Sequence, residues 1–375
     1  MTTAKRIGIL GGGQLARMLV IEGFKIGLEM HVMSRRSTDP AAQVTRYWHE
    51  GDVSNLSQLT EFFKKVDIVT IESEFMDENT LSQATRATGT AVEPHPQLLS
   101  QLSDRLTQKQ WLVDNKIPTA PFVAVRNAED VRDFFKGHPG GIVLKKRRFG
   151  YDGYGTFIIR SSRDFDQWIA ENGQKAADFI AEEFIPFKRE LAVQFAVNGR
   201  GEVLRYPVVE WKAQNSRCLW VKGPARGDSG TKLLLHVEKA LKRGVFHGVI
   251  AFEIFEIGAG KTHSKHWLIN EVAPRVHNSG HYTIEATPTN QFQAHLRAIL
   301  NLPLPKAPKL WSPGFAMWNL LGTSFDVSDD FLPEVQIHWY GKTEARPGRK
   351  MGHITALGAS GDAALKKLKK AIKGF

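Results

Sequence analysis

Short apolar runs separated by amphipathic stretches predict an α/β organisation for residues 1–100. The runs at residues 7–10, 28–33 and 66–71 are short and mainly apolar, as buried strands are. A helical pattern of apolar positions at 14–20 follows the first run after three glycines at 11–13. This order places backbone N–H groups and a helix N-terminus beside the end of a strand, where they can bind an anion.

The glycine turn fits a dinucleotide-binding spacing, because Gly11, Gly13 and Ala16 stand as in G-x-G-x-x-A. A site for NAD expects an acidic residue after the second strand, to hold the ribose hydroxyls. Residues 34–36 read Ser-Arg-Arg instead, which disfavours NAD and leaves NADP open. The third strand ends in Glu-Ser-Glu at 72–74. Carboxylates there either face a ligand crevice or form an exposed acidic loop.

A glycine-rich hairpin is predicted in the middle of the chain, after a helical stretch at 104–112. The strand at 141–146 ends in two lysines, and residues 147–156 contain three closely spaced glycines before the next strand at 157–159. Such a loop can cover nucleotide phosphates, or it can be a structural hairpin with tight-turn glycines. The strand-like run at 179–185 then offers backbone groups that could pair with an adenine edge.

Two apolar strands at 249–257 and 267–272 predict an antiparallel hairpin that carries two carboxylates. A hairpin centred on Thr262 places Glu253 opposite Glu271, with Cβ atoms roughly 5 Å apart. Two carboxylates that close repel each other unless a cation lies between them. The alternatives are one protonated carboxyl or a shifted register. The intervening Gly-Ala-Gly-Lys-Thr at 258–262 resembles a phosphate loop, but a strand follows it, so we interpret it as a hairpin turn.

The run at residues 270–281, Asn-Glu-Val-Ala-Pro-Arg-Val-His-Asn-Ser-Gly-His, is the richest in functional groups. A carboxylate beside an amide suits a hard cation such as Mg²⁺. Arg275 suits a phosphate or a carboxylate. His277 and His281 could suggest zinc, but the residues between them form a poor helix and no further soft ligand is nearby, so we reject a zinc site.

Composition narrows the class of protein. The net charge of +11 favours anionic partners, and five lysines lie on one face of a predicted helix at 365–373. Nucleic-acid binding is not expected, because the basic residues are not interleaved with aromatic ones. No run approaches the ~18 apolar residues of a membrane span, and the N-terminus has no signal-peptide pattern. Cys218 is the only cysteine, which fits a reducing cytoplasm.

The order of the glycine hairpin, the basic strand end and the two late carboxylates resembles that of the ATP-grasp ligases. Six strings resemble, more closely, the N5-carboxyaminoimidazole ribonucleotide synthases, the ATP-dependent carboxylases of bacterial purine synthesis. They span nearly the whole chain in family order. The strings are GGGQLARM at 11–18, DRLTQKQ at 104–110, FGYDG at 149–153, NEVAPRVHNSGH at 270–281, HLRAILNLPLP at 295–305 and RPGRKMGH at 346–353.

The resemblance implies an α/β and α+β protein with the ATP-grasp fold. A Rossmann-like N-terminal domain is expected at 1–100, an ATP-grasp domain at 101–300 with its lid subdomain at about 115–185, and a small C-terminal domain at 301–375. The family is usually dimeric. It uses ATP to phosphorylate bicarbonate to carboxyphosphate, and the exocyclic amine of 5-aminoimidazole ribonucleotide then takes up the carboxyl group. Mg²⁺ and cationic side chains would stabilise the developing charge.

The family's site residues carry over by motif. ATP would be bound by Arg105, Lys145, Gly150, Tyr151, Asp152, Gly153, Tyr154, Gly155, Thr156, Glu182, Glu183, Phe184, Ile185, Glu190, Asn270 and Glu271. Mg²⁺ would be held by Glu253 and Glu271. The ribonucleotide and bicarbonate would contact Gly13, Gln14, Leu15, Glu74, Arg275, His277, Asn278, Ser279, Lys342, Arg349 and Lys350. The residues expected to take part in the chemistry are Tyr151, Asp152, Arg275, His277 and Lys342.

Two positions depart from the family pattern. Tyr154 stands where the family usually has Arg or Lys, and Ala213 stands near a usual histidine in an Asn-x-His motif. The latter contact with the nucleotide is then missing or is replaced by Lys212 or Gln214. Three alternatives follow: another ATP-grasp carboxylate–amine ligase such as a formate-using one, a nucleotide-binding paralogue without catalysis, and an NADP oxidoreductase.

Overall fold

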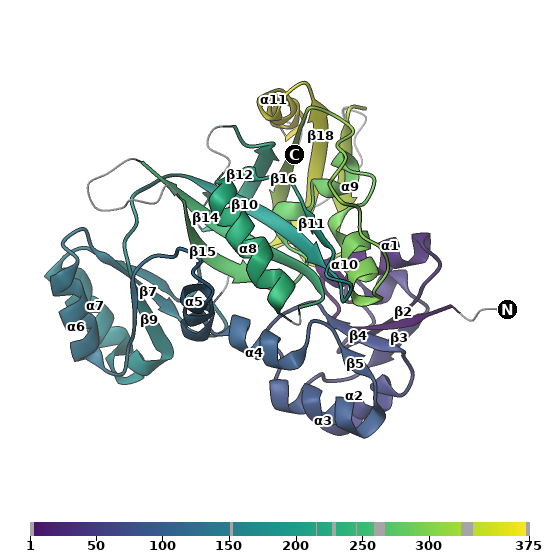
Figure 1. Cartoon of the computed structure of the whole chain (residues 1–375), viewed down its shortest axis with the longest axis horizontal. Coiled ribbons are helices and arrows are strands. Elements are labelled where there is room, and N and C mark those ends of the chain that lie inside the picture. Colours follow the sequence, from purple (N-terminus) through teal and green to yellow (C-terminus); the bar gives the residue numbers. More distant parts are fainter. Residues whose placement is uncertain are drawn as a thin grey trace.

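The chain was analysed as a computed structural model that describes residues 4–150, 153–214, 216–226, 230–244, 246–258, 267–323 and 333–372. Figure 1 shows a small α/β unit at the N-terminus, a separate small sheet flanked by α6 and α7, and a long central sheet with α8 lying across it. The C-terminal helix α11 packs at the far end of the long sheet, beside β16 and β18.

The N-terminal unit is a parallel sheet in the order β3-β2-β1-β4-β5, covered by helices on both faces. Ile7 and Ile9 pack toward α1, whereas Leu10 packs with the phenylalanines of α2, as the alternation of side chains along a strand requires. The three strands and the helix predicted from the sequence are all present. The elements are β1 Arg6–Leu10, α1 Gln14–Lys25, β2 Glu29–Ser34, η1 Ala42–Val44, β3 Tyr47–Glu50, α2 Leu56–Phe63, β4 Ile68–Ile71, α3 Glu78–Thr88, β5 Ala91–Val92 and α4 Pro96–Ser103.

The small sheet has the order β6-β9-β7-β8 and is antiparallel throughout. Strands β7 and β8 are the two arms of the predicted glycine hairpin. Asp104 caps the preceding helix α5 through the N–H of Leu106. The elements are α5 Arg105–Asp114, β6 Phe122–Ala124, α6 Ala128–Gly137, β7 Ile142–Lys146, β8 Thr156–Ile159, α7 Ser162–Asn172, η2 Gly173–Asp178 and β9 Phe179–Glu183.

The long sheet runs β15-β14-β10-β12-β13-β16-β18-β17 within the described residues, and β11 pairs with β10. Strands from the C-terminal region therefore continue the sheet that holds the predicted carboxylate hairpin. The elements are β10 Phe187–Val197, β11 Val203–Arg205, β12 Val209–Gln214, β13 Arg217–Gly223, α8 Thr231–Arg243, β14 Gly248–Ile257, β15 Trp267–Ala273, η3 Asn278–Gly280, α9 Thr283–Ala286, α10 Gln291–Ile299, β16 Gly314–Leu321, β17 Val335–Trp339, β18 Lys350–Gly358 and α11 Gly361–Ala371.

One face of the long sheet is sealed by α8, and this fixes which residues face the other side. Leu191, Val193, Ile250 and Phe252 belong to a buried apolar cluster with the leucines of α8. Because side chains alternate along a strand, the residues adjacent to them in the chain point to the opposite face. Glu190 and Glu253 are among those residues, so the pattern of the strands places these carboxylates on the face away from α8.

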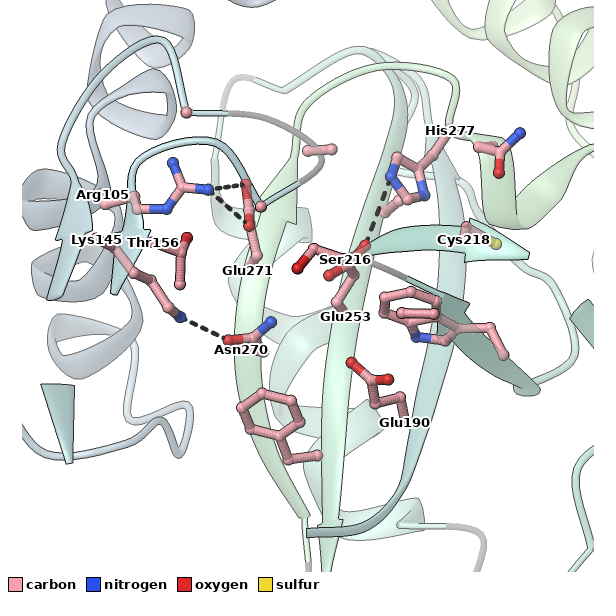
Figure 2. Close-up of a pocket in the computed structure, with 18 of the residues that line it drawn as sticks. Arg105, Lys145, Thr156, Glu190, Ser216, Cys218, Glu253, Asn270, Glu271 and His277 are labelled. Carbon is pink, nitrogen blue, oxygen red and sulfur yellow. Dashed lines mark hydrogen bonds and ion pairs between the residues drawn. The ribbon is translucent and has the colours of Figure 1, made fainter. Parts of the chain in front are cut away.

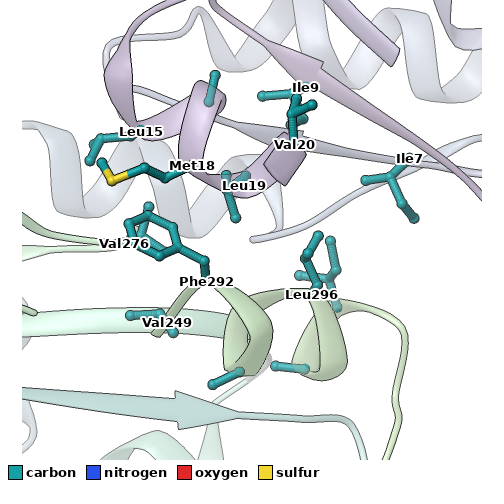
Figure 3. Close-up of a cluster of buried hydrophobic side chains, with 14 of the residues drawn as sticks. Ile7, Ile9, Leu15, Met18, Leu19, Val20, Val249, Val276, Phe292 and Leu296 are labelled. Carbon is teal, nitrogen blue, oxygen red and sulfur yellow. The ribbon is translucent and has the colours of Figure 1, made fainter. Parts of the chain in front are cut away.

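The N-terminal unit is attached to the long sheet by a shared apolar core. Figure 3 shows α1 residues packing against residues of α10 and β14, and the cluster includes Leu19, Val249, Phe292 and Leu296. A buried polar bond crosses the same boundary, because His295 Nε2 lies 2.8 Å from Thr70 Oγ1. The N-terminal unit is therefore packed against the long sheet and is not merely joined to it by the chain.

Candidate active site

A cavity of about 560 Å³ lies where the three units meet, over the face of the long sheet that α8 does not cover. Figure 2 shows its side chains converging from the small sheet, from β14 and β15, and from the turn after β15. Most of the residues predicted as site residues line it. These are Gln14, Leu15, Glu74, Arg105, Lys145, Gly150, Gly153, Thr156, Glu182, Glu183, Phe184, Ile185, Glu190, Glu253, Asn270, Glu271, Arg275, His277, Asn278 and Lys350.

The two carboxylates predicted to face each other do so. Glu253 pairs with Glu271 in the register of β14 and β15, and Ala251 pairs with Ala273 in the same frame. Beyond this point the pairing shifts by one residue, so that Ile254 meets Ile269 and Asn270 is the extra residue of a bulge. Asn270 and Glu271 line the cavity together although they are consecutive in the chain, and the bulge allows this.

Negative charge exceeds positive charge around this pair of carboxylates. Arg105 Nη2 donates to both oxygens of Glu271 at 3.0 Å, as Figure 2 shows. Among the described residues no cation donates a hydrogen bond to Glu253. Burial, followed by the charge of Glu271, raises its pKa to about 8, although Lys145 and Lys350 act in the opposite direction. Burial also raises the pKa of Glu190, on the neighbouring strand, to about 7. In the absence of a cation, Glu253 therefore keeps its proton at neutral pH, which was the alternative considered for this pair.

A buried chain of charges joins the small sheet to the carboxylate hairpin. Lys145 Nζ lies 3.1 Å from Glu182 Oε2 and 2.8 Å from Asn270 Oδ1. Lys109 Nζ reaches the same oxygen of Glu182 at 2.9 Å and is itself fully buried. Burial alone would raise the pKa of Glu182, but the two lysines outweigh it and hold that pKa at about 2. Burial lowers the pKa of Lys109 to about 8. The sequence pattern did not single out Lys109.

Arg275 and His277 occupy the opposite wall. Arg275 donates through Nε and Nη2 to the two carboxylate oxygens of Glu74, so the acidic end of β4 is bound to the polar turn. His277 Nε2 lies 3.7 Å from Glu253 Oε1. Burial, together with Arg275 and Lys350, lowers the pKa of His277 to about 3, so the imidazole is neutral at physiological pH. The wall thus presents one fixed cation and one neutral imidazole to a ligand.

The glycine turn after β1 already binds an anion, and that anion is Glu72. Its carboxylate accepts hydrogen bonds from the N–H groups of Gly13 at 2.5 Å and Leu15 at 3.3 Å. Burial raises the pKa of Glu72 despite these bonds. A pyrophosphate bound as in dinucleotide-binding folds would need the same N–H groups, so the turn is not available to NADP. Gly13 itself does not line the cavity, whereas Gln14 and Leu15 do.

Several predicted site residues lie at the margin of the cavity. Tyr151 and Asp152 lie outside the described residues, so their expected roles stay predictions. Tyr154 and Gly155 are described but do not line the cavity, and the Tyr154 ring lies 5.8 Å from Lys146 Nζ. Gly150 does line it, beside the guanidinium of Arg105. The described part of the glycine hairpin therefore borders the cavity through Gly150, Gly153 and Thr156.

The expected cations of the C-terminal region differ in position. Lys350 lines the cavity, and Lys342 Nζ donates to the carbonyl oxygen of Lys350 at 2.6 Å. Arg349 Nη1 donates to the carbonyl oxygen of Glu344 at 2.9 Å, outside the cavity lining. Lys342 thus contacts a lining residue without lining the cavity itself. Ser279 is buried and likewise contacts a lining residue, His277.

One wall was anticipated from the sequence only at Ala213, the position near the family's usual histidine. Trp211, Ala213, Ser216 and Cys218, on β12 and β13 and in the turn between them, line the cavity, and none carries a charge at neutral pH. Lys212 and Gln214 do not line it. They alternate with the lining residues, as expected for a strand. They therefore do not replace the histidine that the family usually has near Ala213. The alternation of side chains along this strand could have shown this from the sequence.

Any cation bound here would have few protein ligands. Within the described ranges, no group of three or more His, Cys, Asp or Glu side chains is arranged to hold a metal ion. Glu253 and Glu271 supply two carboxylates. Mg²⁺ commonly binds through one or two carboxylates with waters and substrate phosphates completing its shell, so this donor set fits Mg²⁺ bound with a nucleotide.

Comparison with known proteins places this site in a class. The family model of the ATP-grasp domain matches residues 110–292. The ribonucleotide synthetase preATP-grasp domain matches residues 4–102, and the phosphoribosylaminoimidazole carboxylase C-terminal domain matches residues 316–367. The chain therefore has the fold and domain content of an ATP-grasp ligase, as the sequence predicted.

Individual relatives give the family within that class. The N5-carboxyaminoimidazole ribonucleotide synthase of Synechococcus elongatus is 36% identical over 365 residues, which cover 95% of this chain and 90% of that protein. The crystal structure of N5-carboxyaminoimidazole synthetase from Staphylococcus aureus with ADP superposes with a TM-score of 0.89 at 27% identity, covering 99% of this chain and 98% of that one. The chain belongs to the N5-carboxyaminoimidazole ribonucleotide synthase family.

A further relative carries both ligands that bear on the cavity. The synthase from Aspergillus clavatus, crystallised with ADP and 5-aminoimidazole ribonucleotide, superposes with a TM-score of 0.86 at 30% identity. The match covers 100% of this chain and 99% of that one. The family resemblance inferred from six sequence strings is therefore confirmed over the whole chain.

Proposed function

We propose that this protein carboxylates the exocyclic amine of 5-aminoimidazole ribonucleotide, using ATP and bicarbonate, as a step of purine biosynthesis. An oxygen of bicarbonate attacks the γ-phosphorus of ATP, so that ADP leaves and carboxyphosphate forms. The carbon–oxygen bond to phosphate then breaks, and the carbon bonds to the amine nitrogen. Phosphate leaves and the amine gives up one proton, which yields the N5-carboxylated ribonucleotide.

One observation carries this proposal. The carboxylate pair of Glu253 and Glu271 lies between Lys145 and His277, as Figure 2 shows, and Arg275 lines the same cavity. The strand and hairpin residues expected to bind a nucleotide lie on the Lys145 side. His277 and Arg275 offer an imidazole and a guanidinium to an anionic substrate. A phosphoryl group moving from one bound substrate to another would pass across this pair.

Different residues of the cavity would bind the nucleotide, the cation and the substrates. Lys145 and Arg105 bind nucleotide phosphates, and Arg105 gives up its bond to Glu271 when a nucleotide arrives. Mg²⁺, held by Glu253 and Glu271, would offset charge on the transferring phosphoryl group when bound. Arg275 holds the carboxylate or phosphate oxygens of carboxyphosphate, and Lys350 approaches the ribonucleotide phosphate. The hairpin of residues 147–156 excludes water from an intermediate that hydrolyses readily.

We extend the proposal to assembly and location. The family is usually dimeric, and we propose a homodimer in the cytoplasm. Within the described residues, no helix is long and apolar enough to cross a membrane. The dimer is tested by light scattering coupled to gel filtration, where a mass near twice 42.0 kDa is expected and a mass near 42.0 kDa would contradict it.

A nucleotide-binding protein without catalysis is the second candidate, because the wall formed by β12 and β13 has no charged residue facing the cavity. An omission assay separates the two. Purified protein is given ATP, Mg²⁺, bicarbonate and 5-aminoimidazole ribonucleotide, and ADP release is followed as each component is left out in turn. We expect ADP release to need all four. Tight ADP binding in calorimetry with no ribonucleotide-stimulated release would favour the second candidate, and stimulation by formate in place of bicarbonate would indicate a different ligase.

A further inference from the structure

A buried chain of hydrogen bonds ends on His277 from behind the cavity. Gln194 Nε2 donates to Ser279 Oγ at 2.6 Å, and Ser279 Oγ lies 2.8 Å from His277 Nδ1. Gln194 has no exposed surface, Ser279 is 2% exposed, and neither lines the cavity. Gln194 is on the same face of β10 as Glu190, the face turned away from α8. Its amide therefore faces the polar turn of residues 277–280 instead of the apolar core.

The geometry fixes which nitrogen of His277 carries the proton. The backbone N–H of Ser279 is directed to His277 Nδ1 at 3.4 Å, and a backbone N–H can only donate. Nδ1 is therefore the acceptor and is unprotonated. The Ser279 hydroxyl accepts from Gln194, so its own hydrogen is free to point to Nδ1, which agrees with the first assignment. The remaining proton of the neutral ring lies on Nε2.

That protonated nitrogen faces the carboxylate hairpin. His277 Nε2 lies 3.7 Å from Glu253 Oε1, and both residues line the cavity. If the hydrogen bonds ran in the opposite direction, His277 Nδ1 would carry a hydrogen. That hydrogen would face the N–H of Ser279, so that two donors would point at each other. Reversing the amide of Gln194 would leave that conflict in place, because it changes only the bond to the hydroxyl. The backbone contact therefore indicates the direction of the chain. At 3.4 Å it is long, so holding the tautomer depends on the 2.8 Å bond from the Ser279 hydroxyl.

We propose that Gln194 is a positioning residue, which acts through Ser279 to hold His277 as a hydrogen-bond donor at Nε2 toward the bicarbonate-derived oxygens. The inference rests on the proposed function, which places bicarbonate and carboxyphosphate beside His277. An imidazole held in this tautomer has no lone pair at Nε2, so it does not accept the amine proton there. Its task is to orient an oxygen of the carboxyl donor, and another base removes the proton from the amine.

The test reads the tautomer directly, in the full-length protein without substrates. Protein labelled with ¹⁵N-histidine gives two-bond ¹H–¹⁵N correlations that distinguish a protonated from an unprotonated ring nitrogen, and His277→Asn identifies the signal of His277 by its loss. We expect wild type to show only the Nε2–H pattern. Gln194→Leu removes the donor, and Ser279→Ala removes the hydroxyl while keeping the backbone N–H. Both should give a mixture of the two tautomers, with Gln108→Leu as the matched control.

Gln108 is an equally buried amide whose bonds go to Leu102 and Val272 and not to His277, so its loss tests stability alone. We expect Gln108→Leu to keep the wild-type imidazole pattern. In the omission assay, Gln194→Leu should lower kcat by about tenfold and leave the KM for ATP unchanged, an effect typical of groups that orient a functional histidine. An Nδ1–H pattern in wild type, or an unchanged pattern in both variants, would overturn the inference. A wild-type protein that shows the expected pattern but never releases ADP would overturn the proposed function instead.

Discussion

Glu253 and Glu271 lie directly opposite each other on β14 and β15, on the cavity face of the long sheet. The two side chains line the same cavity, and among the described residues only Glu271 accepts hydrogen bonds from a cationic side chain, that of Arg105. Ionising both carboxyl groups of such a pair is unfavourable because the two charges repel each other. A bound divalent cation makes the doubly ionised state favourable. The hairpin is therefore a site whose charge state changes when Mg²⁺ and nucleotide enter.

Glu271→Gln should abolish turnover without unfolding the protein. The amide keeps the shape of the side chain but loses the charge that would hold Mg²⁺, and the developing phosphoryl charge is then less stabilised. We expect kcat to fall by at least roughly a hundredfold and Tm to change by only ~3 °C. Glu256→Gln on β14 is the control, because Glu256 binds Arg189 away from the cavity. Equal activity of Glu271→Gln and wild type would remove the case for a cation site.

Binding of Mg²⁺ with ADP should release protons and should strengthen as the pH rises. The pKa of Glu253 is raised to about 8 by burial and by Glu271, so the metal-free group is protonated at pH 7 and must ionise to bind a cation. Calorimetry in buffers of different ionisation enthalpy measures the protons released. We expect release at pH 7 that disappears at pH 9 and in Glu253→Gln. Binding of Mg²⁺ with ADP without proton release at pH 7 would show that Glu253 is already ionised.

Stability should fall in acid partly through His295. Val249 N–H donates to His295 Nδ1 at 3.0 Å, and burial lowers the pKa of the ring to about 4. The unfolded chain takes up this proton near pH 6.5, so stability is fully present above pH 6.5 and is lost as the pH falls toward 4. The loss amounts to about 3 kcal/mol for this group. Thermal unfolding of His295→Gln should show a smaller decrease in Tm between pH 7 and pH 4, and an unchanged decrease would exclude this residue as a cause.

Lys109→Met should weaken nucleotide binding although Lys109 does not line the cavity. Among the described residues, the change leaves Glu182 with Lys145 as its only close lysine, so Lys145 is drawn toward Glu182 and away from the phosphates. We expect the Kd for ADP to rise roughly tenfold and the free energy of unfolding to fall by about 3 kcal/mol, as when one member of a buried ion pair is removed. Lys136→Met, at an exposed ion pair with Asp133, should alter neither. Unchanged ADP binding by Lys109→Met would make Lys109 purely structural.

Ala213→His should tighten ADP binding. Ala213 faces the cavity from a wall that has no charged side chain, whereas its neighbours Lys212 and Gln214 do not line the cavity. An imidazole at this position can donate a hydrogen bond to a phosphate oxygen, which is typically worth about 1 kcal/mol, or a several-fold lower Kd. Calorimetry with ADP checks this, and Gln214→His serves as the control on the other face. Weaker binding by Ala213→His would mean that the wall is already packed for its ligand.

The sequence predicted the strands, the glycine hairpin and the facing of Glu253 and Glu271, because each follows from periodicity over a short stretch. It did not predict the bulge at Asn270, since a bulge depends on how the neighbouring strands pair. Lys109 looks like any helical lysine, and its burial depends on partners outside its own helix, Glu182 and Thr119. Glu72 is 59 residues from the N–H group of Gly13 that it binds, a distance that local patterns do not cover.

Gln194 illustrates a signal that was present but not used. It is a lone amide within the apolar run of residues 191–197, and a polar residue inside a buried strand needs a partner. The sequence could therefore have marked it as a residue with a specific task. Its partner, Ser279, could be identified only once β10 was seen beside the turn of residues 277–280.

The most direct test of the account follows the oxygen atoms of bicarbonate. In a reaction with ATP, Mg²⁺, 5-aminoimidazole ribonucleotide and bicarbonate labelled with ¹⁸O, phosphorylation of bicarbonate transfers one labelled oxygen to the phosphate that is released. We predict one ¹⁸O atom per phosphate, measured by mass spectrometry or by the ³¹P isotope shift, in the presence of the ribonucleotide. Unlabelled phosphate released during carboxylation would contradict the formation of carboxyphosphate in this site.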